Sequence, residues 1–175
     1  GNDDAEDLKL KQQLSNNPKE RSENIMIVDL VRNDLSQVAQ DGSVVVDELC
    51  GVYTFPHVHQ LISTVSCEVK EGLSSTDLIQ KCFPMGSMTG APKVKAMELI
   101  EKYEETKRGI YSGSIGYFSP DGDFDFNVVI RSILYNAKKE YLSFSVGGAI
   151  THQSEPEQEY EETLLKAKGM IKVLG

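Results

Sequence analysis

The segment Pro18-Lys-Glu-Arg-Ser-Glu-Asn-Ile-Met-Ile-Val-Asp-Leu-Val-Arg-Asn-Asp34 decides the fold. It follows Asn17, and Asn-Pro is typical of a helix start, because Asn caps the first turn and Pro suits the first helical position. Apolar residues then recur at helical spacing as far as Val38. The segment therefore predicts a helix over residues 18 to about 39.

Shorter elements are predicted on both sides of this helix. Residues 3–17 are polar, which indicates a short surface helix or a linker. Strands are expected at 43–46, 52–55, 61–69, 111–118, 124–134 and 141–146, and helices at 76–82, from Pro92 onward and from 156 to about 174. The apolar residues of the Pro92 helix have the spacing of core positions. Because this order lacks regular βαβ alternation, it predicts an α+β fold in which helices flank antiparallel sheets.

Composition and charge restrict the class of protein. The 175 residues are 39% hydrophobic and 26% charged, which is ordinary for a soluble globular domain. The net charge of −9 argues against a nucleic-acid binder. No apolar run reaches the roughly 20 residues that a membrane helix needs. The three cysteines have no metal-site spacing, so we expect free thiols in a cytoplasmic protein.

Two of the predicted helices carry glutamates at the same spacing. Glu20 and Glu23 lie three residues apart, as do Glu159 and Glu162, and Lys166 follows one turn later. Residues three or four apart share a helix face, so neighbouring helices would bring four carboxylates together. Such a cluster repels itself unless a cation binds, and Mg²⁺ prefers oxygen ligands. The same glutamates also fit an ordinary solvated helix face, and spacing alone leaves both interpretations open.

Six blocks of sequence share a resemblance to one family. They are 22–34, 83–93 (Phe-Pro-Met-Gly-Ser-Met-Thr-Gly-Ala-Pro-Lys), 111–117 (Tyr-Ser-Gly-Ser-Ile-Gly-Tyr), 129–131 (Val-Ile-Arg), 146–148 (Val-Gly-Gly) and 159–163 (Glu-Tyr-Glu-Glu-Thr). In this order they resemble the signature blocks of the chorismate-binding enzymes. The resemblance implies the C-terminal half of that fold. Residues 1–17 would be a linker or peripheral helix, and residues 18–175 an incomplete chorismate-binding domain.

The resemblance also implies roles for matching positions. Glu23 and Glu162 match magnesium ligands of the family, and Glu20 and Glu159 match acidic neighbours that hold metal-bound waters. The positions that match substrate-binding residues are Thr89, Gly90, Tyr111, Arg131, Gly147 and Lys166.

Three of these substrate-binding positions have a chemical reason. Tyr111 and Arg131 would bind the enolpyruvyl carboxylate of chorismate, since a planar guanidinium matches a carboxylate. The backbone N–H of Gly147 would contact the same group, where a side chain would obstruct the approach. From the residues alone, Tyr111 fits a core aromatic equally well and Arg131 a paired surface charge.

His57 and His59 are excluded from the predicted site. The family's active-site His precedes the position of Leu61, where this chain has Gln60. His59 is one residue away, and successive residues of a strand point to opposite faces. Ala149 is a second departure, because a third Gly is common there and a methyl group would narrow the pocket floor.

The groups that attack the ring are expected outside this chain. In aminodeoxychorismate synthases, a Lys within Pro-Ile-Lys-Gly-Thr is the nucleophile and a Glu is the general acid; both are expected upstream of residue 1. We therefore expect a catalytically incomplete fragment of an enzyme that uses Mg²⁺. That enzyme would aminate chorismate to 4-amino-4-deoxychorismate, in para-aminobenzoate and folate synthesis, with ammonia from a glutamine amidotransferase subunit.

The subgroup and the class of protein have alternatives. Asn24 and Gln60 favour an aminodeoxychorismate synthase over an anthranilate synthase, in which His is typical at these positions. Anthranilate synthase component I is the nearest alternative. A non-catalytic domain that binds a divalent ion or a partner through its acidic helices is the other. Neither nucleic acid nor membrane is an expected partner.

Overall fold

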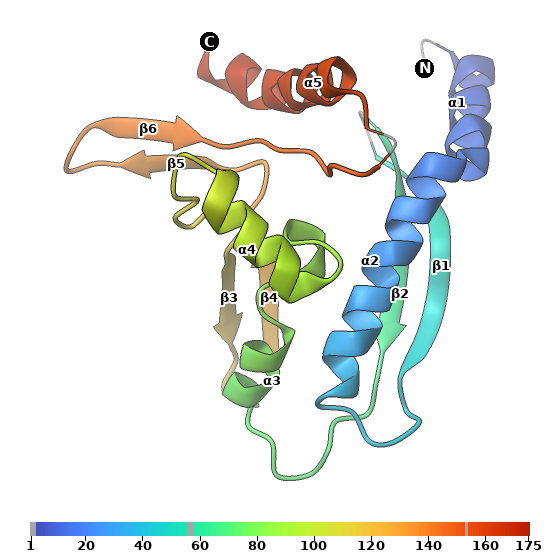
Figure 1. Ribbon diagram of the computed structural model, residues 1–175, viewed down its shortest axis with the longest axis vertical. Helices are drawn as coiled ribbons and strands as arrows, with labels where there is room; N and C mark the ends of the chain where they lie inside the picture. The colour runs from blue at the N-terminus through green and yellow to red at the C-terminus, as the bar shows by residue number, and fades with distance from the viewer. Residues whose placement is uncertain (1–2, 56–57, 153) are drawn as a thin grey trace. The chain divides into compact units, whose positions relative to one another are not determined.

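Helices and antiparallel hairpins alternate along the chain, as the sequence predicts. The computed structural model describes residues 3–55, 58–152 and 154–175, and the chain divides into two units, Gly1–Ile100 and Glu101–Gly175 (Figure 1). The first unit contains α1 (Asp4–Asn16), α2 (Pro18–Ser36), β1 (Val45–Thr54), β2 (His59–Ser66), α3 (Ser75–Cys82), the 3₁₀ helix η1 (Gly86–Met88) and most of α4 (Lys93–Tyr103). The second contains β3 (Ser114–Phe118), β4 (Phe124–Val128), β5 (Ile133–Asn136), β6 (Tyr141–Phe144) and α5 (Pro156–Leu174).

Helix α2 begins where the sequence predicts and ends earlier. The Asn17 side chain accepts hydrogen bonds from the N–H groups of Lys19 and Glu20, at 3.0 and 3.2 Å, and Pro18 is in the first turn. The helix ends at Ser36, and not near residue 39 as predicted. Ala39 instead forms an antiparallel bridge with Val69. The pairing of this backbone with the segment that follows β2 therefore replaces the last helical turn.

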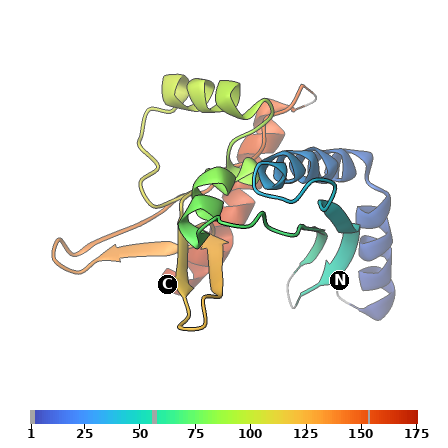
Figure 2. The ribbon, with the colours of Figure 1, turned by 90° about the horizontal axis from the view of Figure 1, so that it is seen from below.

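The hairpin β1–β2 packs against α1 and α2, as both Figure 1 and Figure 2 show. The two strands predicted at 43–46 and 52–55 are one strand, because the segment between them is a bulge and not a turn. The register shifts between Glu48 and Gly51, where Cys50 adopts a φ of +55°. A bulge places an extra residue in one strand and redirects its backbone.

Asn24 joins α2 to this bulge. Its Oδ1 accepts hydrogen bonds from Ser63 Oγ at 2.5 Å and from Cys50 Sγ at 3.4 Å. Ser63 Oγ in turn accepts the Cys50 N–H at 2.8 Å, which satisfies a donor that the bulge removes from the ladder. Because Cys50 is buried, an unpaired donor here would cost stability. The network therefore fixes both the bulge and the position of the helix above it.

The segment after the hairpin packs on α2. A capping box between Ser74 and Asp77 starts α3 at Ser75, one residue before the predicted start. The 3₁₀ helix η1 lies within the predicted loop at 83–90. Burial raises the pKa of the Cys82 thiol, and the charge of Asp34 raises it further. All three cysteines are free, as the sequence predicts, but only Cys50 is buried, whereas mostly buried thiols are expected from the sequence.

The predicted core face of α4 is wrong. The helix is present, but Val94, Met97 and Leu99 are exposed, Val94 by 72%. Their spacing gives the helix an apolar face, but it does not require that the partner of this face lies within these residues.

The second unit is built from two short hairpins and α5. β3 pairs with β4 and β5 with β6, both antiparallel. The strand predicted at 124–134 is divided, because Arg131 has a φ of +49° and turns the chain between β4 and β5. α5 matches its prediction. Among the described residues, no helix combines the length and apolarity needed to cross a bilayer.

We predict that Asn24→Ala destabilises the chain by about 1–3 kcal/mol, because it leaves the Ser63 hydroxyl and the Cys50 thiol without their acceptor. The measurement is the free energy of unfolding in urea. Asn33→Ala is the control, since Asn33 is exposed on the same helix and should change this free energy by less than about 0.5 kcal/mol. Equal effects of the two substitutions would show that the network has no special role.

Candidate metal and carboxylate site

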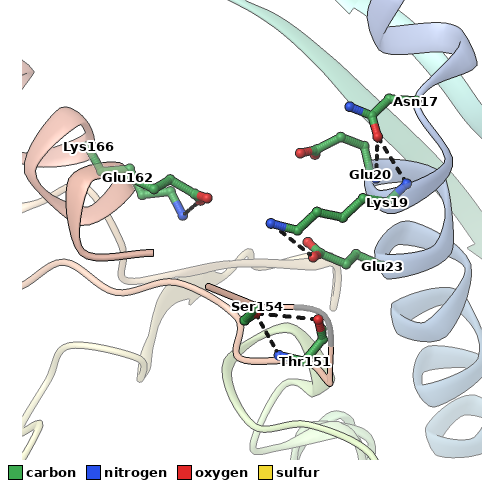
Figure 3. Close-up of polar contacts among 8 residues, drawn as sticks. All are labelled: Asn17, Lys19, Glu20, Glu23, Thr151, Ser154, Glu162 and Lys166. Atoms are coloured by element: carbon green, nitrogen blue, oxygen red, sulfur yellow. Dashed lines mark hydrogen bonds and ion pairs between the residues drawn. The ribbon is translucent and has the colours of Figure 1, made fainter. Parts of the chain in front are cut away.

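The acidic pair of the first unit lies on the first turns of α2 (Figure 3). Glu20 is exposed, and its backbone N–H is held by Asn17. The Oε1 atom of Glu23 is buried and lies 4.0 Å from Lys19 Nζ, one turn earlier on the helix. Glu23 is therefore a carboxylate with a buried oxygen and a cation nearby.

Thr89 and Gly90 lie in a loop that its own hydrogen bonds hold in shape. Thr89 Oγ1 donates to the carbonyl oxygens of Met85 and Gly86, at 3.3 Å each, and the Thr89 N–H donates to Gly86 O at 3.2 Å. Gly90 has a φ of +149°, and a Cβ at this position would lie 3.0 Å from the Cβ of Ala96. A side chain at Gly90 would therefore strain the entry into α4.

The acidic pair of the second unit lies on α5 and has a different environment. Glu159 is buried. Glu162 forms an ion pair with Lys166 at 2.5 Å (Figure 3), and Lys166 Nζ also donates to the carbonyl oxygen of Gly147 at 3.1 Å. Lys166 therefore connects α5 to the Gly147-Gly148 segment that follows β6.

The backbone at Gly147 and Gly148 lies against two functional groups. A Cβ on Gly147 would be 3.1 Å from the hydroxyl of Tyr111, and a Cβ on Gly148 would be 3.2 Å from Oε2 of Glu159. Both contacts are tighter than most contacts of real Cβ atoms. The second unit thus brings Tyr111, Glu159 and Lys166 around one stretch of glycine backbone.

Tyr111 is positioned by a tight turn that the sequence does not reveal. The predicted strand at 111–118 starts only at Ser114, because Ser112 is buried with a φ of +67°. Arg108 Nη1 donates to Ser112 Oγ at 3.0 Å, while its other nitrogens hold Glu104 at 2.8 and 2.5 Å. The i,i+4 spacing of Glu104 and Arg108 could have indicated the pair, but nothing in it points to Ser112.

Arg131, a predicted substrate-binding residue, takes no part in the contacts above, and the same holds for His59, which is excluded from the predicted site. Arg131 is exposed and lies two residues after the buried Val129, which follows β4. His57 lies outside the described residues. His59 contacts Asp7 Oδ1 at 3.1 Å through Nε2 and Thr54 Oγ1 at 3.0 Å through Nδ1, so its ring joins α1 to the hairpin. Gln60 pairs with Tyr53 across the hairpin.

The carboxylate oxygens of these glutamates are the type of ligand that a hard divalent cation binds. Carboxylate oxygens are the ligands that Mg²⁺ prefers, usually one or two from the protein, completed by waters and an anionic ligand. The buried oxygen of Glu23 and the buried Glu159 suit such a role. Within the described ranges, no group of three or more His, Cys, Asp or Glu side chains could hold a metal by itself.

Comparison with known proteins gives consistent matches over the whole chain. The family model for chorismate binding enzyme matches residues 1–172. Aminodeoxychorismate synthase component 1 from Escherichia coli (strain K12) is 45% identical over 172 residues, which cover 98% of this chain and 38% of that protein. Anthranilate synthase component 1 from Aquifex aeolicus is 40% identical over 174 residues, which cover 99% of this chain and 35% of that protein.

A solved structure supports the predicted fold class. The crystal structure of anthranilate synthase component I from Streptococcus pneumoniae matches 95% of this chain with a TM-score of 0.81 and 36% sequence identity. It also shows the difference in length, because the match covers only 38% of that chain. The chain therefore spans less than two fifths of the length of each of these proteins.

The Glu104–Arg108 pair gives a prediction on ionisation. The hydrogen bonds from Arg108 lower the pKa of Glu104 below its usual 4.5. The pair therefore stabilises the fold above about pH 4.5, and its contribution is lost as the pH falls through the lowered pKa. We expect Arg108→Met to return the pKa of Glu104 towards its ordinary range in a carboxyl-detected NMR titration.

Lys107→Met is the matched control for this titration, since it removes a neighbouring cation that pairs with Glu101. It should leave the pKa of Glu104 low. If both substitutions raised that pKa equally, general charge and not the Arg108 contact would be its cause.

Proposed function

Because this chain belongs to the family of chorismate-binding enzymes, we propose that it forms the metal- and carboxylate-binding part of an enzyme that aminates chorismate to 4-amino-4-deoxychorismate. The observation that carries the proposal is the arrangement in the second unit. Tyr111 and Glu159 approach the backbone of Gly147 and Gly148 so closely that a side chain there would disturb them, while Lys166 holds the carbonyl of Gly147. This arrangement suits an anion that approaches bare backbone.

In this proposal the second unit binds the enolpyruvyl carboxylate. The Tyr111 hydroxyl donates a hydrogen bond, and the N–H of Gly147 donates a second one next to it. Arg131 supplies the positive charge, since its exposed guanidinium can form two parallel hydrogen bonds to a carboxylate. Lys166 fixes the glycine backbone, and Thr89 and Gly90 line the pocket of the ring.

The proposed metal is Mg²⁺, held by Glu23 and Glu162, with Glu20 and Glu159 holding its waters. When bound, the ion would neutralise the ring carboxylate and draw electron density from the ring as the hydroxyl leaves. In the absence of the ion, Lys19 and Lys166 each lie one turn from a proposed ligand and offset its charge. These lysines support the proposal, because each one offsets the charge of its own carboxylate before metal binds.

The ammonia would come from glutamine through a separate amidotransferase subunit. The relative from Escherichia coli is named as component 1 of its synthase, and that name implies a partner subunit. Asn24 and Gln60 favour amination without loss of pyruvate. Anthranilate synthesis is the second candidate, and it is supported by the 40% identity with the Aquifex aeolicus enzyme.

The large exposed surface supports a place for this chain within a longer enzyme. The chain exposes 12802 Å², whereas a compact protein of its mass exposes about 8500 Å². Two separate compact units of these sizes would still expose only about 10,000 Å². Exposed apolar side chains contribute to the excess, among them Val94, Ile115, Leu165 and Val173. We attribute this surface to contacts with the part of the enzyme that supplies the nucleophilic Lys and the acid Glu.

We predict that Glu162→Gln weakens Mg²⁺ binding at least tenfold, because it removes a charged oxygen ligand. Glu23→Gln should do the same. Isothermal titration with MgCl₂ in the presence of chorismate measures the affinity, and circular dichroism checks that each variant is folded. Glu161→Gln is the control, since Glu161 is an exposed neighbour on α5. Unchanged affinity in Glu23→Gln or Glu162→Gln would show that the ligands are wrongly assigned.

The isolated chain should have little or no activity with chorismate, ammonia and Mg²⁺, because the groups that attack the ring are expected elsewhere. A longer chain that includes the preceding sequence should form 4-amino-4-deoxychorismate, which chromatography distinguishes from anthranilate. Turnover of the isolated chain at the rate of the longer one would contradict the proposal that the groups that attack the ring lie outside these residues. Anthranilate as the product would favour the second candidate.

A further inference from the structure

The loop that contains Thr89 and Gly90 is attached to α2 at two points. At the first, Gly86 packs so closely on α2 that a Cβ there would lie 2.8 Å from the Cβ of Leu30. At the second, Lys93 Nζ lies 2.5 Å from Oδ2 of Asp34. Leu30 and Asp34 are four residues apart and thus share one face of the helix. The loop therefore leaves the helix surface and returns to it one turn further on.

The second attachment is a buried ion pair. Only 7% of the Asp34 side chain and 19% of the Lys93 side chain are exposed. Another ion pair of the same helix, Arg32 with Asp29, is 52% and 65% exposed and is of the kind that contributes little. If one partner of the buried pair is removed, the other charge remains in a poorly solvated place. An unpaired buried charge is strongly destabilising, so the attachment of the loop to α2 would be lost.

The geometry connects this ion pair to the proposed site. Thr89 and Gly90 lie between the two attachment points. Glu23 shares a face of α2 with Leu30 and Asp34, because it precedes them by 7 and 11 residues, and both spacings return to the same face of a helix. At 1.5 Å per residue, Asp34 is about 16 Å from Glu23 along the axis. A straight helix thus sets the separation between the proposed metal ligand and the loop.

We propose that the Asp34–Lys93 ion pair is a positioning device, which holds the Thr89–Gly90 backbone at a fixed distance from Glu23. The proposal rests on the proposed function for its role in chorismate binding, but the attachment itself is independent of it. Lys93 and Asp34 act through the loop, and neither needs to touch the substrate.

Hydrogen exchange tests the attachment without any substrate. The N–H groups of Met88 and Thr89 donate to carbonyls within the loop, so their exchange reports on its order. We expect Lys93→Met to accelerate exchange at both amides by roughly tenfold or more, while amides in the middle of α2 keep their protection. Lys93→Arg, which keeps the charge, should restore most of the protection. Arg32→Met is the control, because it breaks only the exposed pair.

A double variant provides the test if Lys93→Met unfolds the protein by leaving the buried Asp34 carboxylate without its partner. Asp34→Leu with Lys93→Met removes both charges, and such apolar replacements commonly keep a fold stable. Its loop amides should still exchange roughly tenfold faster than in the unmodified chain, because Leu and Met replace a charge-assisted contact of defined direction. Protection equal to that of the unmodified chain in this double variant, or in a folded Lys93→Met variant, would overturn the proposal.

A second arm separates this inference from the proposed function. In the longer enzyme, the double variant should raise the KM for chorismate roughly tenfold or more, with a smaller change in kcat, whereas Arg32→Met should change neither. Faster loop exchange with an unchanged KM would overturn the link to substrate binding. If the unmodified enzyme binds no chorismate while the exchange results hold, the proposed function fails and the attachment stands.

Discussion

The hydrogen bonds between Asn24 and the bulge of β1 determine which way helix α2 faces. Asn24 and the buried Val28 lie towards the hairpin. Glu23, Leu30 and Asp34 lie on a stripe about 100° around the helix from Asn24. If the helix rotated by that amount, Glu23 would point elsewhere, and Leu30 and Asp34 would no longer face the loop that they hold. One half-buried amide thus fixes several features that are distant in sequence.

In each unit a lysine one helical turn away offsets the negative charge of a proposed metal ligand, but the two contacts differ in length. In the first, Lys19 precedes Glu23 by one turn and stays 4.0 Å from it. In the second, Lys166 follows Glu162 by one turn, contacts it at 2.5 Å and also holds Gly147. Under the proposed function, a cation on Glu162 would compete with this direct ion pair, which adds to the cost of metal binding in the second unit.

The sequence predicts well what depends on local chemistry. The start of α2 at Asn17-Pro18, the cap of α3 and the bounds of α5 follow from side chains within a few residues. It fails where distant pairing decides, as at Ala39, whose bridge to Val69 ends the helix, and at Cys50, whose bulge depends on Ser63. Within the candidate site, the motif blocks indicated Tyr111 and Gly147 by resemblance. The support from Arg108 and the pairing of Asp34 with Lys93 depend on contacts that no spacing reveals.

The shallow burial of this chain affects how it responds to temperature. Among the described residues, the buried apolar side chains are few, with Val28, Val38, Ala39 and Cys50 in one unit and Val129, Ala167 and Met170 in the other. The heat capacity change of unfolding grows with the apolar area that unfolding exposes, and is ordinarily about 12–15 cal/mol/K per residue. A chain that already exposes so much of this area should lie below that range. Its stability curve is then broad and low, and neither cooling nor moderate heating changes its free energy of unfolding sharply.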